Sequence, residues 1–356
     1  MRGLILAGGE GTRLRPITYT SAKQLVPVAN RPILFYGLDA MARAGIRQVG
    51  IVVGDTGTEI ERAVGDGRRF GLDITYIPQA APLGLAHCVL IARNFLGDDD
   101  FVMYLGDNLL EIGLAPFLET FAADRGAAVA QILLCPVPDP TRFGVAELGE
   151  DGHVIRLVEK PVDPPSDLAL VGVYLFDRHI HDAVASIAPS ARGELEITDA
   201  IQWLLDQGHV VRAHRLDGWW IDTGKLTPLL EANRLILERL VPAREGKVDE
   251  ASVLEGRVVV EVGAEVIRST VRGPAIIGER TRIVDSYVGP FTAIYHDCEV
   301  TGSEIEHSVV LEGSRIVNAG RIVDSLIGRE VELVRSRRRP RATRLMLGDH
   351  SQVDLA

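Results

Sequence analysis

The sequence predicts an α/β protein with a doubly wound, mainly parallel sheet, followed by a solenoid of short strands. Over roughly the first 240 residues, short apolar runs alternate with stretches of helical spacing. From about residue 245, single aliphatic residues recur instead at steps of five or six. The chain has 356 residues, which is long for one hydrophobic core. We therefore expect two domains, at residues 1–240 and 245–335, and a basic tail at residues 336–356.

The predicted sheet is built from short buried strands that alternate with helices. The strands are expected at residues 3–7, 49–53, 74–77, 101–105 and 129–134, and the helices at residues 33–44, 59–64 and 85–92. The first helix shows apolar residues at helical spacing and ends at Gly45. In open sheets of this kind, ligands bind beyond the carboxyl ends of the strands, so polar residues that follow strands are candidate site residues.

The C-terminal third has the spacing of a triangular β-solenoid. A helix would repeat every three or four residues and a strand every two, whereas a step near six supplies one inward aliphatic residue per short side. The expected inward residues are Val262, Ile277, Ile283, Val288, Ile294, Val300, Ile305, Val310, Ile316, Ile322, Ile327 and Leu333.

Composition excludes several classes of protein. The formal net charge of -11 disfavours broad binding to nucleic acid. No apolar run approaches the roughly 20 residues that span a bilayer, so we expect no membrane segment. Cys88, Cys135 and Cys298 lie far apart without a CxxC spacing, which argues against a disulfide framework or a zinc cluster and indicates a reducing cytoplasm.

A glycine-rich loop follows the first predicted strand. Gly8, Gly9 and Gly11 allow the backbone to approach a ligand closely and to present N–H groups to anionic oxygens. The GxxxxGK[ST] phosphate loop is absent, and Leu14 stands where the dinucleotide-binding pattern needs a third glycine. By itself the loop could equally be a structural turn. Arg13, within the loop, and Lys23, shortly after it, suit a nucleoside triphosphate, because contacts to phosphate from cations are charge-assisted.

At this point the sequence resembles the sugar nucleotidyltransferase family. LAGGEGTRLRPIT at residues 6–18 and KQLVPV at 23–28 match the opening pattern of that family, and the SxKQLxPV form resembles the glucose-1-phosphate thymidylyltransferases. Later blocks agree in order: PLGLAH at 82–87, LGDN at 105–108, FGV at 143–145, EKP at 159–161, PSARGELEITD at 189–199 and WIDTG at 220–224. The solenoid resembles the left-handed β-helix of the longer members of the thymidylyltransferase group.

The resemblance implies a Rossmann-like nucleotidyltransferase domain and assigns its site residues. The implied nucleotide contacts are Gly8, Gly9, Gly11, Thr12, Arg13, Lys23, Gln24, Gln79 and Gly84; the sugar-phosphate contacts are Gly144, Glu159, Lys160, Gly172, Tyr174 and Arg192. Arg13, Lys23 and Lys160 are the implied catalytic residues. Asp107 and Asp222 are the implied ligands of Mg2+, a cation that prefers a few carboxylate oxygens together with substrate phosphates. The alternative for each aspartate alone is a role in a turn.

The implied reaction joins dTTP and α-D-glucose 1-phosphate to give dTDP-glucose and pyrophosphate, the first step of deoxysugar nucleotide biosynthesis. The resemblance also implies a homo-oligomer that uses Mg2+. Together with the composition, it leads us to expect a cytoplasmic protein that binds neither nucleic acid nor membrane. Three alternatives stay open: UTP, GTP or ATP, or another sugar phosphate, as substrate; an acyltransferase that uses His296 or His307 of the solenoid; and a non-catalytic regulatory subunit. The six arginines at 335–344 form either a solvated end or a contact with a subunit or an acidic partner.

Overall fold

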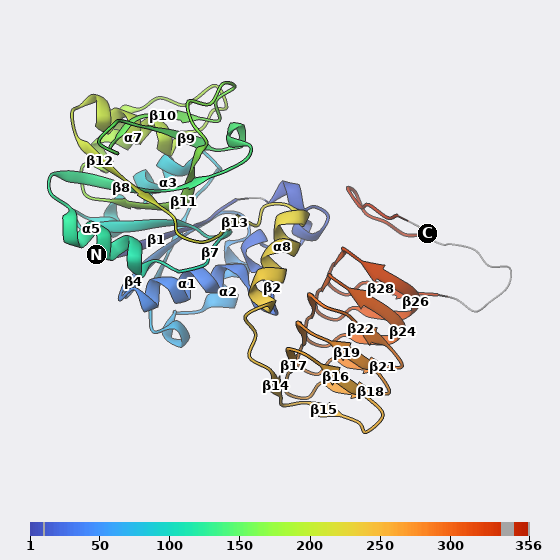
Figure 1. The fold of residues 1–356 in the computed structure, drawn as a ribbon. Helices are drawn as coiled ribbons and strands as arrows, with labels where there is room; N and C mark the ends of the chain where they lie inside the picture. Colours follow the sequence, from blue (N-terminus) through green and yellow to red (C-terminus); the bar gives the residue numbers. More distant parts are fainter. Residues whose placement is uncertain (10, 336–344, 355–356) are drawn as a thin grey trace. The chain divides into compact units, whose positions relative to one another are not determined.

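The computed structural model describes residues 1–9, 11–335 and 345–354 (Figure 1). The chain forms two compact units, each discontinuous in sequence. Met1–Glu10 and Ile33–Ile221 make up the first unit, and Gly11–Pro32 and Asp222–Ala356 make up the second. The predicted domain bounds of 1–240 and 245–335 stay a prediction. The predicted tail at 336–356 lies partly outside the described residues, and of the six arginines at 335–344 only Arg335 is described.

The first unit contains a nine-stranded sheet in which β10, β9, β11, β6, β1, β4 and β5 lie side by side and β8 joins β11 to β12. The strands are β1 (Arg2–Ala7), β4 (Gln48–Val53), β5 (Asp73–Pro78), β6 (Phe101–Leu105), β8 (Ala128–Pro136), β9 (Gly144–Leu148), β10 (Val154–Glu159), β11 (Leu168–Phe176) and β12 (Val210–Arg215). β6, β1, β4 and β5 are parallel, with Leu6 paired to both Val52 and Leu105. β11 runs antiparallel to β6, β8 and β9.

Helices cover this sheet and bury its apolar side chains. They are α1 (Ile33–Arg43), α2 (Gly57–Val64), α3 (Leu85–Ile91), α4 (Arg93–Leu96), α5 (Ala115–Asp124), α6 (Ile180–Ser186) and α7 (Ile197–Asp206). Figure 1 shows α1 and α2 on one side of the strands and α3 and α7 on the other. The predicted strands and helices up to residue 134 are confirmed, with ends that differ by one or two residues. A separate two-stranded sheet consists of β7 (Asn108–Leu110), which follows β6 in sequence, and β13 (Trp220–Asp222).

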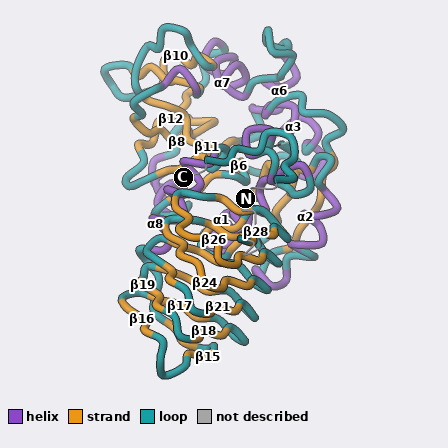
Figure 2. The backbone as a smooth tube through the Cα atoms, turned by 90° about the vertical axis from the view of Figure 1, so that its right-hand side faces the viewer, coloured by secondary structure: helices purple, strands orange, loops and turns teal. Residues whose placement is uncertain are grey.

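The second unit begins with three 3-10 turns and a hairpin and continues after a gap with one helix and the solenoid. The turns are η1 (Thr12–Leu14), η2 (Ile17–Tyr19) and η3 (Lys23–Leu25), the hairpin is β2 (Pro27–Val28) and β3 (Arg31–Pro32), and the helix is α8 (Leu226–Leu237). The solenoid follows α8 directly in sequence, and its stacked coils are visible in Figure 2.

The solenoid is a stack of parallel strands on three sides. One side consists of β14 (Ala243–Arg244), β17 (Val258–Val260), β20 (Ala275–Ile277), β23 (Thr292–Ile294), β25 (Val309–Val310) and β27 (Leu326–Ile327). The second contains β15 (Lys247–Val248), β18 (Glu265–Ile267), β21 (Arg282–Val284) and β28 (Glu332–Val334), and the third contains β16 (Val253–Glu255), β19 (Thr270–Arg272) and β22 (Tyr287–Val288). β24 (Glu299–Glu306) and β26 (Arg315–Val323) run through the corner between these two sides.

Small hydroxyl residues at one corner connect successive coils. The N–H of Ser286 donates to Ser269 Oγ at 3.1 Å, and the N–H of Ser303 donates to Ser286 Oγ at 3.2 Å, a repeat of 17 residues. Each of these hydroxyls also donates to a carbonyl two residues earlier, as Ser286 does to Val284 at 2.6 Å. A buried backbone group needs a partner, so a serine at this corner satisfies both its own coil and the next.

Most of the predicted inward aliphatic residues lie in the solenoid core, but two predictions are wrong. Nine of the twelve are buried, and Ile322 is partly buried against the core. Val262 is 60% exposed because it lies in the turn before Ala264, and the neighbouring Val260 and Val266 point inward instead. Leu333 is 41% exposed because β28 is the last strand of its stack among the described residues, so no further coil covers it.

Within the described part of the chain, we find no helix with the length and apolar character needed to cross a membrane.

Candidate active site

A pocket in the first unit lies at the carboxyl ends of β1, β4 and β5. Its lining residues are Gly8, Gly9, Gly54, Asp55, Thr56, Gln79, Ala80, Ala81 and Pro82. Each of the three segments follows one of the three neighbouring parallel strands, as expected for a ligand site in an open sheet. The sequence predicted Gly8, Gly9 and Gln79 here. It missed Gly54, Asp55 and Thr56, whose only signal was their position directly after a predicted strand.

Two glycines in this region have no room for a side chain. A Cβ on Gly8 would lie 3.0 Å from Gln79 Oε1 and 3.4 Å from the Gly54 nitrogen. Gly84 has φ +103, and a Cβ there would lie 2.3 Å from the carbonyl oxygen of Leu195. Leu195 also exchanges backbone hydrogen bonds with Leu83 at 2.8 Å and with Ala86 at 3.0 Å. Gly84 therefore keeps the loop before α3 pressed against the segment around Leu195.

The side-chain amide of Gln79 is fixed by a contact with His87. Gln79 is buried, and its Nε2 lies 3.0 Å from Nδ1 of the partly buried His87. Since Nε2 can only donate, Nδ1 of His87 is the acceptor, which directs Gln79 Oε1 away from His87. The adjacent Cys88 is also buried, and this burial raises the pKa of its thiol to about 12. His87 was not among the predicted site residues.

Glu159, at the end of β10, is the centre of a charged cluster. Its carboxylate lies 3.4 Å from Lys160 Nζ, accepts from Arg192 Nη2 at 3.2 Å and accepts from Thr198 Oγ1 at 3.2 Å. Arg192 also donates to Glu196 at 2.7 Å, and the side chain of Glu196 is 5% exposed. The structure thus brings together the predicted residues Glu159, Lys160 and Arg192. It adds Thr198 from α7 and Glu196, the residue directly before α7.

The predicted glycines near this cluster mark close contacts. A Cβ on Gly144 would lie 2.6 Å from Thr198 Cγ2 and 3.2 Å from Glu159 Oε2, so this glycine borders the cluster directly. Gly172, in β11, would place a Cβ 2.7 Å from Asn108 Oδ1. Tyr174 is buried in the core of the sheet, and burial raises the pKa of its hydroxyl, with the nearby Glu159 carboxylate adding to the effect.

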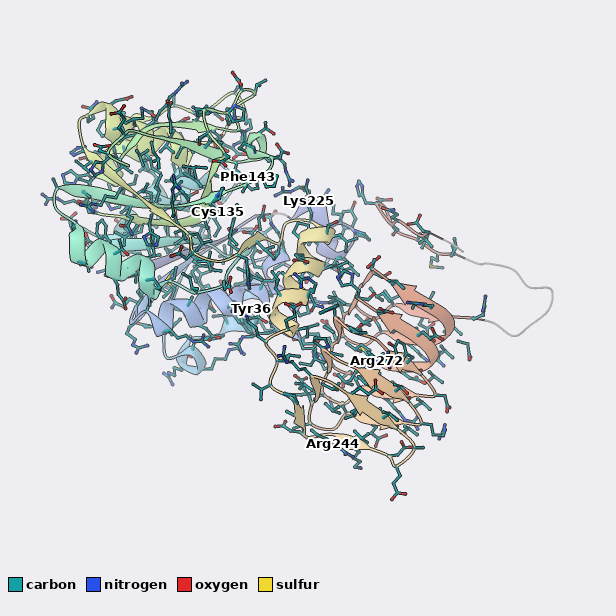
Figure 3. The ribbon with its side chains drawn as sticks, viewed as in Figure 1. Tyr36, Cys135, Phe143, Lys225, Arg244 and Arg272 are labelled. Carbon is teal, nitrogen blue, oxygen red and sulfur yellow. The ribbon has the colours of Figure 1, made fainter. Side chains whose placement is uncertain are left out.

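Asn108 connects Asp107, the predicted metal ligand of the first unit, to the aromatic side chains of Trp220 and Phe143. Its Nδ2 donates to Asp107 Oδ1 at 2.8 Å, and its Oδ1 accepts from Trp220 Nε1 at 2.5 Å. The Trp220 ring packs edge-on against Phe143 with centroids 5.2 Å apart, and Phe143 is labelled in Figure 3. Asp107 is therefore held at the end of β6 by a buried amide that the sequence motif contained without showing its role.

The second unit gathers Arg13, Lys23 and Asp222 around Gly224. Lys23 Nζ lies 3.9 Å from Asp222 Oδ1, and the Lys23 side chain is only 7% exposed. Asp222 Oδ1 also accepts the N–H of Gly224 at 3.0 Å. A Cβ on Gly224 would lie 3.0 Å from Lys23 Nζ, 3.0 Å from Asp222 Oδ1 and 3.1 Å from Arg13 Nη2. Two cations and a carboxylate thus converge on one backbone position.

The loop that carries these cations is folded on itself. Gly11 has φ +66, and a Cβ there would lie 2.9 Å from Lys23 Cβ. Thr18 Oγ1 donates to the carbonyl of Gly11 at 2.7 Å. Thr12 and Arg13 are exposed, whereas Gln24 is buried, and its Oε1 has no hydrogen-bond partner among the described residues.

The predicted site residues therefore fall into three groups: the pocket and the charged cluster of the first unit, and the cationic loop of the second. Asp107 belongs to the first unit and Asp222 to the second, so their pairing on one metal ion stays a prediction. No group of three or more His, Cys, Asp or Glu side chains suited to a metal ion occurs in the described ranges. In the solenoid, His296 Nδ1 lies 2.7 Å from Asp297, and His307 Nδ1 lies 2.5 Å from Asp324.

Comparison with known proteins adds the family. A family model described as nucleotidyl transferase matches residues 2–239, well over half of the chain. The chain belongs to the nucleotidyl transferase family. It is 59% identical over 356 residues to a glucose-1-phosphate thymidylyltransferase of Streptomyces griseus, covering 100% of both chains. A Streptomyces antibioticus protein of the same name is 58% identical over 355 residues, covering 100% of this chain and 99% of the relative.

Other similar proteins are more distant. A low-salt glycan biosynthesis nucleotidyltransferase, Agl11, of Haloferax volcanii is 45% identical over the full length of both chains. Among solved structures, a putative glucose-1-phosphate thymidylyltransferase from Bacillus anthracis in complex with a sucrose has a TM-score of 0.63 at 36% identity, covering 68% of this chain and 98% of that one. A UDP-glucose pyrophosphorylase complexed with UDP-glucose has a TM-score of 0.60 at 24% identity, which shows a shared fold only.

Proposed function

We propose that this chain is a glucose-1-phosphate thymidylyltransferase: it converts dTTP and α-D-glucose 1-phosphate into dTDP-glucose and pyrophosphate. The observation that carries the proposal is the identity of 59% over the whole chain to a relative of that name, solenoid included. The three groups of polar residues support it, because a reaction between two anions needs cations near both phosphates. An acyltransferase or a regulatory subunit has no comparable support.

The cationic loop is the proposed triphosphate site. Arg13 is exposed and Lys23 is nearly buried, so one can reach toward an incoming ligand while the other is already fixed. The N–H groups around Gly8, Gly9, Gly11 and Thr12 would hold phosphate oxygens. As the bond from the α-phosphorus to the bridging oxygen breaks, Arg13 and Lys23 would stabilise the negative charge that grows on the departing pyrophosphate.

The charged cluster is the proposed site of the sugar phosphate. Glu159 is suited to accept hydrogen bonds from sugar hydroxyls, and Lys160 provides a cation for the phosphate. Gly144 of β9 borders Glu159, and Gly172 and Tyr174 of β11 are the other proposed contacts of the sugar. Arg192 contributes positive charge beside Glu159, and its guanidinium is also bound by Glu196.

A phosphate oxygen of glucose 1-phosphate would then attack the α-phosphorus in line with the departing pyrophosphate. The protein supplies no nucleophile, so its residues act by position and charge. The donor set fits a divalent cation: Asp107 and Asp222 are hard carboxylate ligands, and Mg2+ commonly takes one or two of these together with substrate phosphates. When bound, Mg2+ would supply Lewis-acid stabilisation of charge on the phosphate oxygens.

The proposed contacts to the base are Gln24, Gln79 and Gly84. The Gln79 amide is the best defined of these, because His87 fixes its direction. The unpaired Oε1 of the buried Gln24 offers an acceptor for a donor group, such as the imide N–H of thymine.

One assay tests the substrate assignment. Purified protein is given Mg2+ and glucose 1-phosphate with dTTP, UTP, GTP or ATP in turn, and pyrophosphate release is measured. We expect the highest kcat/KM with dTTP and none without sugar phosphate or after removal of divalent cations with EDTA. A higher kcat/KM with another nucleotide would contradict the thymidylyl specificity, and an absence of pyrophosphate in all four reactions would contradict the activity itself.

Arg13→Ala tests the triphosphate site separately. We expect it to lower kcat/KM by a factor on the order of 10²–10³, the usual cost of removing a group that stabilises developing negative charge. A variant that retains wild-type kinetics would contradict the role of this loop.

The proposal includes three further properties of the enzyme: its domain plan, its location and its oligomeric state. The domain plan is a catalytic part at residues 1–240, a left-handed β-helix at 245–335 and the basic tail. Cys88, Cys135 and Cys298 are free thiols, which supports a reducing cytoplasmic location. We also propose a homo-oligomer, which light scattering after size-exclusion chromatography would test.

A further inference from the structure

The cationic loop is built into the same compact unit as the solenoid. The segment Gly11–Pro32 groups with Asp222–Ala356, although residues 33–221 separate them in sequence. The loop ends in the hairpin β2–β3, whose turn consists of Ala29 with φ +47 and Asn30 with φ +58. Two successive left-handed residues define a tight turn of fixed geometry. Its contacts therefore determine where the loop is held.

Asn233, in α8, binds the hairpin turn on one side and the solenoid on the other. It is 0% exposed. Its Oδ1 accepts the backbone N–H of Ala29 at 2.9 Å, and its Nδ2 donates to the carbonyl of Phe291 at 2.9 Å. Phe291 lies directly before β23. A fully buried carboxamide with both ends engaged is a specific connection, because any displacement leaves buried polar groups unpaired.

A second tether holds the hairpin turn, and an apolar contact holds the earlier part of the loop. Asn30 Nδ2 donates to the carbonyl of Ile294, the last residue of β23, at 2.9 Å. At the start of the loop, Ile17 packs beside Gly328, where an added Cβ would lie 3.1 Å from Ile17 Cδ1. The loop is thus held to the solenoid near both of its ends. Lys23 lies between them, four residues before β2 begins with Pro27.

We propose that Asn233 is a positioning residue for nucleotide binding, and that the solenoid serves as the support that holds the cationic loop. This inference rests on the proposed role of Arg13 and Lys23 in binding the triphosphate. Asn233 does not touch substrate in this scheme. It fixes the hairpin, the hairpin fixes η3, and η3 carries Lys23 into its contact with Asp222 beside Gly224.

Two variants test the tethers in the full-length protein. Asn233→Leu keeps the approximate shape and removes both hydrogen bonds. Asn30→Gly removes the amide bond to Ile294 together with the side-chain hydrogen bond between Asn30 and Glu261, and glycine accepts the positive φ without strain. Arg272→Ala is the matched control: it breaks the exposed Arg272–Glu255 pair of the solenoid, and Arg272 is labelled in Figure 3. Each variant is assayed for KM of dTTP, KM of glucose 1-phosphate, dTTP affinity by calorimetry, and melting temperature.

We expect Asn233→Leu to raise KM and Kd for dTTP about tenfold and Asn30→Gly to raise them about threefold, the scale of one or two lost buried hydrogen bonds. KM for glucose 1-phosphate should stay within twofold in both, and the control should match wild type in every kinetic constant. A purely structural role would instead lower the melting temperature and the amount of active enzyme without changing Kd for dTTP. That result overturns the inference.

Lys23→Met separates this inference from the proposed function. If Lys23→Met leaves Kd for dTTP unchanged, the loop is not the triphosphate site and the proposed function of the loop fails. If Lys23→Met weakens dTTP binding while Asn233→Leu and Asn30→Gly do not, the triphosphate site stands and the positioning role is wrong. Should Asn233→Leu fail to fold, the Asn30→Gly measurement decides the question alone.

Discussion

Gly224→Ala should damage catalysis without removing any functional group. Its new methyl would lie 3.0 Å from Lys23 Nζ, 3.0 Å from Asp222 Oδ1 and 3.1 Å from Arg13 Nη2, all closer than an ordinary van der Waals contact. Gly224 has no left-handed φ, so alanine fits the backbone itself. The strain therefore falls on three charged groups that the mechanism uses together.

The expected size follows from these distances. Relief requires the neighbours to retreat by a few tenths of an ångström. Catalytic groups need to be held within about 0.5 Å, and misplacement by about 1 Å can cost about a hundredfold in rate. We therefore expect kcat/KM for dTTP to fall about tenfold, or about 1.4 kcal/mol of transition-state stabilisation. Stability should change little, because replacing glycine also stabilises by about 0.4–1 kcal/mol through the unfolded chain.

The assay is pyrophosphate release at varied dTTP and saturating glucose 1-phosphate, with circular dichroism melting in parallel. Gly348→Ala is the matched control, since nothing lies within 4 Å of a Cβ built there and its backbone needs no positive φ. Gly224→Ala with kcat/KM for dTTP within twofold of wild type would refute the view that Arg13, Lys23 and Asp222 act as one site.

Three other substitutions probe separate parts of the structure. Glu159→Gln should raise KM for glucose 1-phosphate about tenfold and leave KM for dTTP unchanged, because it weakens charged hydrogen bonds worth about 1.5–3 kcal/mol; equal effects on both substrates would count against a sugar site. His87→Phe should raise KM for dTTP about threefold by freeing the Gln79 amide, and His87→Gln should restore it, with calorimetric dTTP binding as the check. Ser286→Ala should lower the free energy of unfolding in urea by about 1–3 kcal/mol, because the buried N–H of Ser303 loses its acceptor, while kcat stays at the wild-type value.

The sequence was sufficient to predict the order of the first strands and helices but not the direction of every strand. The near-continuous apolar run of β11 (Leu168–Phe176) indicates burial on both faces, which all nine residues confirm. Periodicity carries no information on orientation, however, and β11 is antiparallel to all three of its neighbours. That arrangement depends on contacts with strands from separate parts of the chain, as for the pairing of Phe176 with Phe101.

The irregular steps of the solenoid have a simple structural cause. The inward residues Ile277, Ile283, Val288 and Ile294 are separated by steps of six, five and six, and a coil has 17 residues. A strict hexapeptide pattern requires 18 per coil, so the match in sequence is loose although the core is regular. At the ends of the stack the pattern alone fails, because burial of an aliphatic residue there depends on whether another coil covers it.

For the site, the sequence predicted the groups that carry charge and missed the groups that hold them. The resemblance assigned roles to Glu159 and Lys160, whereas it assigned none to Glu196, although Glu196 lies within the matched block at 189–199. His87 likewise ends the matched block at 82–87 without an assigned role, and Asn233 lies outside every matched block. Their roles arise from approach in space, as when Asn233 contacts Ala29 across 204 positions.

The same distinction changes the interpretation of Arg192. The motif assigns it to the sugar phosphate, but its guanidinium lies 2.7 Å from Glu196 and 3.2 Å from Glu159, two carboxylates that already compensate its charge. A phosphate that bound Arg192 would have to compete with a buried carboxylate. Lys160 has one carboxylate neighbour at 3.4 Å, and its side chain is 44% exposed, so its ammonium can turn to a ligand at little cost. The geometry therefore favours Lys160 as the main phosphate ligand and Arg192 as the residue that keeps Glu159 aimed at the sugar.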